Sequence, residues 1–192
     1  VLTASVLLWV GFFLASALGL WKFQHERARV LALVQEKDAL RQRAEEEIRQ
    51  LAYHDALTQL PNRRLLMDRL AQLQSASFRH GRYSALFFMD LDGFKQLNDA
   101  HGHDQGDQLL IAVGQRLQAC VREEDTVARL GGDEFVVMLF ELSPDAGTAR
   151  AQAETVAHKI LEALAAPYQL TGLTYRCTLS IGIALFGPQN ES

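Results

Sequence analysis

The stretch RLGGDEFVVML, Arg129 to Leu139, places two glycines and two acids directly before an apolar run. The runs on either side of the glycines, residues 126–130 and 134–140, are typical of buried strands. Gly-Gly between two such runs predicts a tight hairpin, because the favoured turns need positive φ. Asp133 and Glu134 then lie at its tip. They either belong to a site or only keep the turn soluble, which is the commoner role of acids beside turn glycines.

A second acidic cluster closes another apolar run, SALFFMDLD, residues 84–92. Alternation along a strand points Asp90 and Asp92 to the same face. If this strand lies beside the hairpin, three or four carboxylates converge and raise each other's pKa. A hard divalent cation would relieve that repulsion, and oxygen ligands suit Mg²⁺ or Mn²⁺. The pattern favours a metal site on the condition that the two segments meet.

Polar residues around the Gly-rich segment DAHGHDQGD, residues 99–107, suit a guanine base. Guanine presents N1–H and N2–H donors that one carboxylate can accept together, and adenine lacks this pair. Asp107 and Asn98 could supply the carboxylate and an amide, or they could simply cap helices. Lys95 could contact a phosphate as a point charge, although most lysines are only solvated.

The order of the expected elements indicates an α/β domain of the α+β type. Helices are expected from Pro61 and Asn62 onward and at 94–97, 108–120 and 144–166, with strands at 84–92, 126–130, 134–140, 173–178 and 179–186. Residues 99–107 are expected to form a loop. We expect the helices to pack on a mainly antiparallel sheet.

The N-terminal residues 1–21 contain no charged residue and at helical rise extend over roughly 31 Å, enough for a bilayer core. We expect a membrane span, with a buried core helix or a signal peptide as alternatives. Lys22, Arg27 and Arg29 follow at once. The positive-inside rule then places the rest of the chain in the cytoplasm.

Residues 23–52 are charged and carry one thin apolar stripe, which predicts a long helix. Lys37 falls where a heptad repeat would have an apolar residue, so the register is imperfect. The helix is either solvated alone or pairs with a second copy. We favour a parallel dimeric stalk, because a long polar helix is poorly stabilised by itself.

The composition excludes several classes of protein. Net charge is −4, so no basic surface indicates a nucleic-acid partner. The two cysteines, Cys120 and Cys177, lie far apart, which argues against a disulfide framework or a zinc site and fits a reducing compartment. The chain begins with Val1 and stops soon after a strand-like run, so we expect a fragment cut at both ends.

The segments DALTQLPNRR, DLDGFKQLND, GHDQGD, RLGGDEF and SIGIA together resemble the GGDEF family of diguanylate cyclases, from residue 55 to about residue 186. The resemblance implies a ferredoxin-like core similar to that of class III nucleotidyl cyclases. It implies condensation of two GTP into cyclic di-GMP with release of two pyrophosphates. Because each GTP attacks the other, two domains would face each other in a homodimer.

The resemblance also assigns the metal and the catalytic acids. Asp90 and Asp133 would hold Mg²⁺, or Mn²⁺, with the backbone carbonyl of Leu91 as a further ligand. Glu134 or Asp133 would help deprotonate the attacking 3′-hydroxyl. The chemistry is in-line phosphoryl transfer, assisted mostly by metal and positioning.

Four further residues would contact the nucleotide in the family: Lys95, Asn98, His103 and Asp107. Asn98 and Asp107 would read guanine, His103 would lie nearby, and Lys95 would contact phosphate. Arg122 and Asp125 match the spacing of an inhibitory site that binds the product cyclic di-GMP. The alternative for that pair is an ordinary surface contact near a helix end.

We therefore expect a transmembrane helix at 1–21, a helical linker at 22–54, and a GGDEF domain at 55–192 that is truncated at its C-terminal end. The expected location is the bacterial inner membrane, with the domain facing the cytoplasm. The alternative function is a non-catalytic module that senses GTP or cyclic di-GMP and regulates a downstream phosphodiesterase domain. Both GGDEF acids are present, which favours the enzyme, and a purely structural dimerisation segment would leave the acid pattern unexplained.

Overall fold

A computed structural model describes residues 2–187, except for the side chains at 2–8, 10, 15, 23, 26, 28–30 and 32. The chain divides into two compact units, Val1–Arg49 and Gln50–Ser192. Helix α1 (Leu2–Tyr53) forms the first unit up to Arg49, and its last turn belongs to the second unit. The second unit contains all other helices and strands in the described part of the chain.

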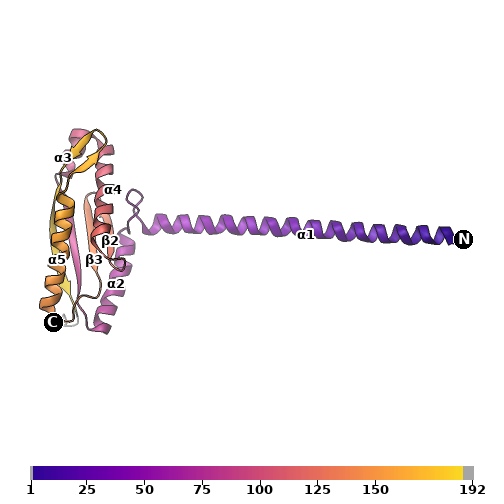
Figure 1. Ribbon diagram of the computed structural model, residues 1–192, viewed down its shortest axis with the longest axis horizontal. Helices are drawn as coiled ribbons and strands as arrows, with labels where there is room; N and C mark the ends of the chain where they lie inside the picture. Colours follow the sequence, from indigo (N-terminus) through magenta and orange to yellow (C-terminus); the bar gives the residue numbers. More distant parts are fainter. Residues whose placement is uncertain (1, 188–192) are drawn as a thin grey trace. The chain divides into compact units, whose positions relative to one another are not determined.

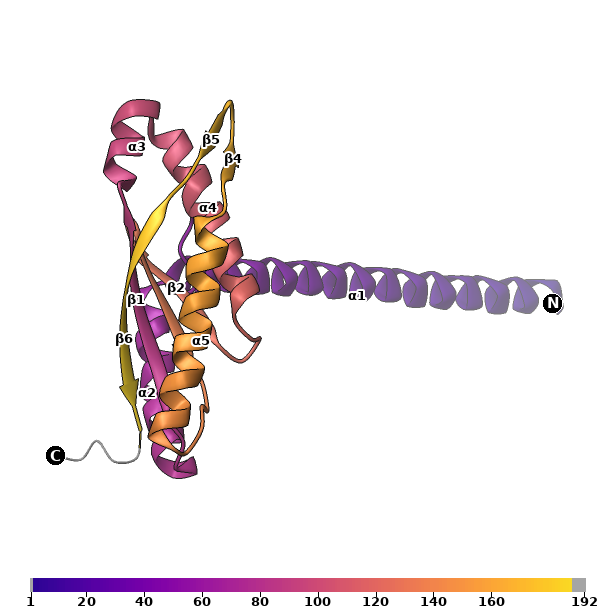
Figure 2. The ribbon, with the colours of Figure 1, turned by 60° about the vertical axis from the view of Figure 1, so that its left-hand side comes forward.

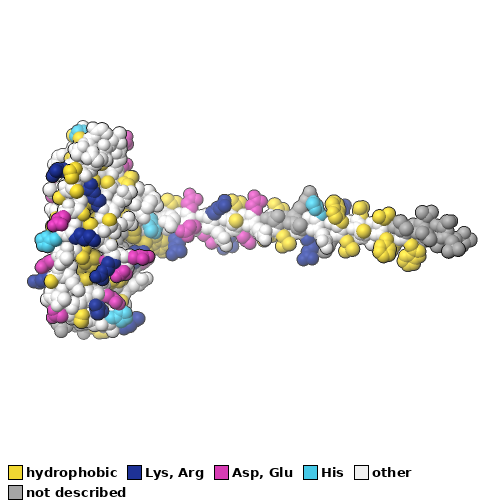
Figure 3. Space-filling model, in the orientation of Figure 1, with side chains coloured by type: hydrophobic (Ala, Val, Ile, Leu, Met, Phe, Trp, Pro, Cys, Tyr) yellow, Lys and Arg dark blue, Asp and Glu magenta, His cyan; other side chains and the backbone are white. Residues whose placement is uncertain are grey.

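Helix α1 includes the predicted charged helix at 23–52 without a break. Figure 3 shows acidic and basic side chains mixed along its C-terminal half and apolar side chains along the described part of its N-terminal half. Among the described residues, no helix is both long and apolar enough to cross a membrane. The membrane span predicted over residues 1–21 is therefore not supported, and part of that segment lies outside the described side chains.

Four antiparallel strands form the main sheet (Figure 1): β1 (Ser84–Asp92), β2 (Thr126–Gly131), β3 (Glu134–Leu139) and β6 (Thr178–Phe186). Their order in the sheet is β2-β3-β1-β6, so β1 lies between β3 and β6. Helices join β1 to β2 and β3 to β6. These two strand–helix–strand units, in this strand order, form the ferredoxin-like arrangement that the family resemblance implied. The predicted antiparallel sheet is confirmed.

Alternation along β1 separates two hydrophobic clusters. Phe87 and Met89 are buried under helices α4 (His103–Cys120) and α5 (Ala146–Ala165), in the larger cluster. On the opposite face, helix α2 (Arg63–His80) packs Leu66 and Leu73 against Val136 and other residues of β2 and β3. Each fully buried aliphatic or aromatic side chain contributes about 1.5–3 kcal/mol, so the two faces hold the sheet between helices. Figure 2 shows α5 along one face of the sheet.

The helix starts and stops follow local chemistry. Asn62 caps α2, as predicted, because its side chain accepts hydrogen bonds from the N–H groups of Arg64 and Leu65. The predicted loop at 99–107 is wrong. Helix α3 (Phe94–His101) and α4 are separated by Gly102 alone, whose φ of 87° turns the chain within one residue.

The C-terminal strands also differ from the prediction. A small hairpin, β4 (Tyr168–Leu170) and β5 (Leu173–Tyr175), precedes β6. Strand β4 has only three residues, too few to show alternation in the sequence. Gln108 of α4 accepts hydrogen bonds from the N–H and the hydroxyl of Thr171, at 2.9 and 3.0 Å, and so holds the hairpin against α4.

Candidate active site

The end of β1 and the β2–β3 turn lie side by side, which meets the condition set for the predicted metal site. Asp90 pairs with Glu134 across β1 and β3. Gly131 and Gly132 have φ values of 139° and 53°, so a side chain at either position would be strained. The turn therefore brings Asp133 and Glu134 to the end of β1.

Asp90 and Asp92 both point to the exposed side of β1, whereas Leu91 between them is buried. Burial raises the pKa of Asp90, and the negative charges of Asp133, Glu134 and Asp92 raise it further. No hydrogen bond or ion pair to the Asp90 side chain occurs within residues 2–187. The Asp90 carboxylate is thus a charge without a compensating partner in this part of the chain.

Two of the three acids near Asp90 have partners of their own. Asp92 accepts hydrogen bonds from the hydroxyls of Thr178 (2.7 Å) and Ser180 (3.1 Å) on β6. Glu134 lies 3.9 Å from Arg63 of α2, an exposed contact that contributes little to stability. In the described residues, no group of three or more His, Cys, Asp or Glu side chains is arranged to hold a metal ion. The expected convergence of three or four carboxylates on one ion is therefore not supported.

A hollow of about 550 Å³ opens beside these acids. Residues from α2, β1, β2, β3 and β6 line it, among them Arg63, Phe88, Asp90, Leu130, Glu134 and Ser180. Phe88 is 50% exposed there. The volume is within the range of small-molecule sites, and the lining combines an apolar floor with both signs of charge.

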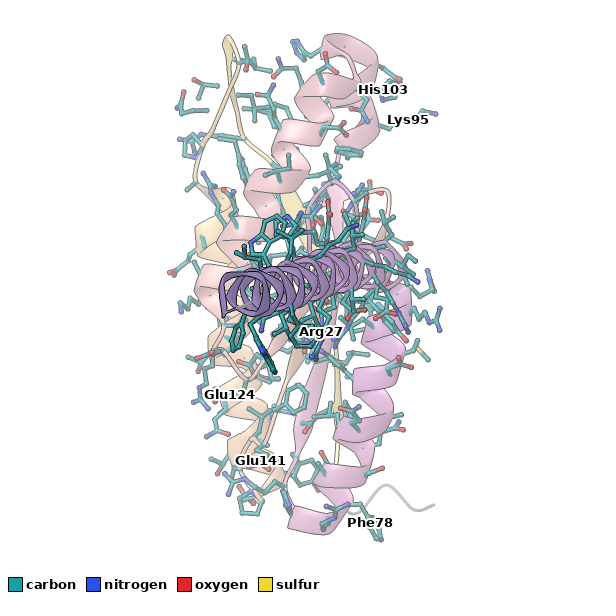
Figure 4. All side chains as sticks on the ribbon, turned by 90° about the vertical axis from the view of Figure 1, so that its right-hand side faces the viewer. Arg27, Phe78, Lys95, His103, Glu124 and Glu141 are labelled. Atoms are coloured by element: carbon teal, nitrogen blue, oxygen red, sulfur yellow. The ribbon has the colours of Figure 1, made fainter. Side chains whose placement is uncertain are left out.

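The predicted nucleotide contacts lie on α3 and α4. Figure 4 shows Lys95 and His103 near the same end of the domain. The Asn98 side-chain oxygen is buried and has no hydrogen-bond partner among the described residues. A Cβ at Gly106 would overlap that oxygen, so α4 approaches Asn98 closely just before Asp107.

Neither Asn98 nor Asp107 caps a helix N-terminus, which was the alternative role for these two residues. The N-caps of α3 and α4 are Gly93 and Gly102, which have no side-chain oxygen. A buried amide oxygen without a partner costs about 1–3 kcal/mol, a cost that a ligand's N–H would remove. Gly106, the residue before Asp107, thus lies against Asn98 across the α3–α4 junction, and the Asn98 oxygen is free to accept a hydrogen bond from a ligand.

The predicted inhibitory-site residues, Arg122 and Asp125, line a second hollow of about 450 Å³ together with Arg82 and Lys159. Asp125 is already engaged, since its carboxylate accepts hydrogen bonds from the N–H groups of Arg122 (2.9 Å) and Phe140 (3.0 Å). The Arg122 guanidinium is exposed and lies 3.7 Å from Glu124. Asp125 therefore shapes the turn, and Arg122 remains accessible at the hollow.

Sequence reasoning missed the network around Arg129. This residue is only 9% exposed. Its guanidinium donates to the Gly132 carbonyl and forms an ion pair of 2.8 Å with Asp55. The Asp-x-x-Thr spacing of Asp55 and Thr58 is a recognisable signal for a side chain that bonds its own backbone. Nothing in the sequence pattern links that turn to Arg129.

The match to a known family covers most of the second unit. Residues 52–192 match the family model "Diguanylate cyclase, GGDEF domain". The chain is 51% identical over 144 residues to the bifunctional diguanylate cyclase/cyclic di-GMP phosphodiesterase MucR of Pseudomonas aeruginosa, covering 75% of this chain and 20% of MucR. It is 39% identical over 159 residues to the diguanylate cyclase TpbB of the same species, covering 81% of this chain and 35% of TpbB. The chain thus spans a fifth to about a third of these relatives.

Solved structures give the same result. A TpbB structure comprising only the GGDEF domain superimposes with a TM-score of 0.65 at 41% identity, covering 70% of this chain and 76% of that one. The coiled coil and GGDEF domain of DgcB from Caulobacter crescentus, in complex with c-di-GMP, gives 0.71 at 26% identity, with coverages of 84% and 83%. The resemblance read from the motifs is confirmed, and the chain belongs to the GGDEF-domain family of diguanylate cyclases.

Proposed function

We propose that the domain is an active diguanylate cyclase that condenses two GTP into cyclic di-GMP and releases two pyrophosphates. The observation that carries this proposal is the placement of Asp90 directly across from the turn that bears Asp133 and Glu134. Like charges this close destabilise the metal-free protein. Such clusters are typical of sites that bind a cation or a charged substrate.

A divalent cation, Mg²⁺ or Mn²⁺, is the proposed cofactor. Asp90, Asp133 and the backbone carbonyl of Leu91 would hold it, because they offer only oxygen donors and the Asp90 charge is uncompensated. A cation bound there would neutralise phosphate charge and lower the cost of in-line transfer. Two carboxylates and a carbonyl leave room for phosphate oxygens in its coordination shell.

The protein's own residues then have separate tasks. Asn98 and Asp107 hold the guanine edge, with His103 nearby, and Lys95 contacts a phosphate. Glu134 or Asp133 accepts the proton of the 3′-hydroxyl. The 3′-oxygen forms a bond to the α-phosphorus of the other GTP, and the bond from that phosphorus to the pyrophosphate oxygen breaks.

The same exchange in the opposite direction closes the ring, which requires two nucleotides placed head to tail. One domain with one guanine site binds one GTP, so two copies of the chain must face each other. A homodimer is therefore part of the proposal. The similarity to DgcB, solved as a coiled coil with its GGDEF domain, supports a paired helix upstream of the domain.

Product inhibition is proposed for the second hollow. Arg122 remains accessible there, and Arg82 and Lys159 add positive charge to the lining. The planar guanidinium of Arg122 can grip a phosphate or a guanine edge. Cyclic di-GMP offers both groups.

A second candidate function rests on a specific similarity. The chain is 36% identical over 95% of its length to the cyclic di-GMP phosphodiesterase NbdA of Pseudomonas aeruginosa, and it spans 24% of that protein. A domain of this kind could bind GTP or cyclic di-GMP without turnover and regulate a phosphodiesterase elsewhere in a longer chain. Both GGDEF acids remain here, which favours catalysis.

The deciding experiment is to incubate the protein with GTP and Mg²⁺ and to separate the products by chromatography. We expect cyclic di-GMP and pyrophosphate from the parent, and a loss of at least about 100-fold in Asp133→Asn and Glu134→Gln. Glu154→Gln, an exposed acid on α5, is the control and should retain activity. GTP binding without any product would instead support the sensing module.

A further inference from the structure

The segment between α1 and α2 is bound to the β2–β3 turn through one side chain. Arg129 donates from Nε and Nη2 to the Gly132 carbonyl, at 3.0 and 2.8 Å. Its third contact, from Nη1, goes to the Asp55 carboxylate at 2.8 Å, 74 residues away in sequence. Two donors on one carbonyl fix the plane of the peptide that leads directly into Asp133.

The backbone adds a second connection. The N–H of Arg129 donates to the Pro61 carbonyl at 2.9 Å. Asn62, next to Pro61, donates from its side chain to the Ala52 carbonyl and from its N–H to the Tyr53 carbonyl, at 3.0 and 2.9 Å. The segment 55–62 is thus held on one side by the last turn of α1 and on the other by the hairpin.

A second Asp-x-x-Thr turn, at Asp145, has the same local hydrogen bonds as the turn at Asp55. Comparing the two shows which contacts are specific to Asp55. Asp55 accepts from the N–H and hydroxyl of Thr58, at 2.8 and 2.6 Å. Asp145 accepts from the N–H and hydroxyl of Thr148, at 2.8 and 2.7 Å, in the same local geometry. Asp145 is fully exposed and only caps α5, whereas Asp55 is also paired with a buried arginine.

We propose that Arg129 is a positioning residue that, with Asp55 behind it, sets the direction of Asp133. Arg129 does not line the hollow beside the acids, so the proposed role is indirect. Its planar fork spans the Asp55 carboxylate and the Gly132 carbonyl at once, which a lysine ammonium cannot do. The inference rests on the proposed function only where it concerns turnover, since the position of the turn can be measured without any substrate.

The test uses the whole chain with Arg129→Lys, Asp55→Asn and the control Asp145→Asn. Backbone amide NMR signals of Gly131, Gly132 and Asp133 report the turn directly. We expect these signals to shift or broaden in Arg129→Lys and Asp55→Asn and to stay in place in Asp145→Asn. Asp55→Asn keeps the shape of the side chain and removes the charge, so it remains informative if Arg129→Lys folds poorly.

Turnover gives the second readout, measured well below each variant's melting temperature. We expect kcat to fall by roughly 10- to 100-fold in Arg129→Lys while KM for GTP changes by less than about threefold, because the guanine contacts are untouched. The Mg²⁺ concentration for half-maximal rate should rise. A merely structural role would reduce the folded fraction without changing that Mg²⁺ requirement.

Unmoved turn signals in both variants would overturn the proposal, even if activity falls. So would a normal kcat and Mg²⁺ requirement in Arg129→Lys when Asp133→Asn is inactive. If the parent itself makes no cyclic di-GMP, the proposed function fails. The NMR comparison with Asp145→Asn then still decides whether Arg129 and Asp55 hold the turn.

Discussion

Asp90 is the residue at which the charge of the site is least compensated. Its pKa is raised by burial and then by Asp133, Glu134 and Asp92. A raised pKa means that the folded protein binds the proton more tightly than the unfolded chain does. The metal-free protein therefore loses stability as pH rises through the window just above the ordinary value of 3.8.

Asp133→Asn should remove one source of that repulsion. We expect the pKa of Asp90 to fall and the melting temperature in EDTA at pH 7 to rise by about 1 °C, a small effect because the acids are solvent-screened. Added Mg²⁺ should stabilise the parent more than the variant. Carboxyl NMR titration and thermal denaturation measure the two effects, with the exposed Asp68→Asn as control. An unchanged Asp90 titration would show that the two side chains do not interact.

The absence of a side chain at Gly106 leaves the space that the Asn98 side chain occupies. Gly106→Ala places a methyl group where the Asn98 oxygen lies, so the amide must move. Affinity for GTP should fall at least about tenfold, and the preference for GTP over ATP should shrink, because the pocket's polar match is lost. Stability should change by less than about 1 kcal/mol, since alanine favours the helix and offsets part of the clash.

Gly147→Ala is the matched control for this change. It also lies in the first turn of a helix, but the nearest atom to its new Cβ is Asp145 Oδ1 at 3.5 Å, an ordinary contact. Calorimetric titration with GTP compares the two variants. Full GTP affinity in Gly106→Ala would contradict the role given to Asn98.

Among the elements, the turn at residues 55–61 has a measurable share in stability. Burial alone would raise the pKa of Asp55, but hydrogen bonds from Thr58 and the contact with Arg129 outweigh it and lower the pKa. A lowered pKa means that the stabilisation is present above the unfolded-state value and is lost as pH falls through the folded-state value. Asp55→Asn should therefore cost about 1–3 kcal/mol at pH 7, because the partly buried Arg129 loses its partner.

The cost of Asp55→Asn should shrink as pH falls from the ordinary pKa of 3.8 through the lowered folded-state pKa, below which the parent's Asp55 is neutral as well. Urea unfolding at pH 7 and at the lowest pH that keeps the parent folded measures this difference. Asp145→Asn controls for loss of the same local turn. Equal destabilisation at both pH values would show that the charge of Asp55 is not what matters.

The sequence predicted those elements in which the hydrophobic pattern is long, or in which one residue type determines the backbone conformation. The nine residues of β1, the hairpin glycines and the Asn62 cap were all predictable from local chemistry. The start of α4 was not, because Gly102 can equally begin a loop or join two helices. The side-chain partners of Asp92 and Arg129, Thr178 and Asp55, lie more than 70 residues away, and no local pattern encodes such contacts.

The molecule combines the acidic site with a second hollow, for which we propose product inhibition. Arg122→Ala should leave GTP binding intact and weaken inhibition by cyclic di-GMP at least about tenfold, because the accessible guanidinium is the main grip on phosphate. Rates measured with added product, for the parent and the variant, test this. Arg150→Ala, an exposed arginine on α5, serves as the control. Equal inhibition of parent and Arg122→Ala would move the product site elsewhere.

Two chains are expected to pair through α1. The large apolar side chains on the stripe of its C-terminal half include four that are more than half exposed in a single chain: Leu33, Leu40, Ile48 and Leu51. A helix of this kind is poorly stabilised alone, and a second copy would bury the stripe. Because the proposed reaction needs two facing domains, pairing raises the concentration of one domain around the other.

Leu40→Glu should therefore weaken the dimer and lower the rate per chain, and the loss should grow on dilution. At high protein concentration the rate should recover, since the domain itself is unchanged. Sedimentation and the concentration dependence of specific activity measure both effects, with Gln42→Glu adding the same charge off the stripe. A Leu40→Glu rate per chain that stays constant on dilution and equals the parent's would mean that α1 does not bring the two domains together.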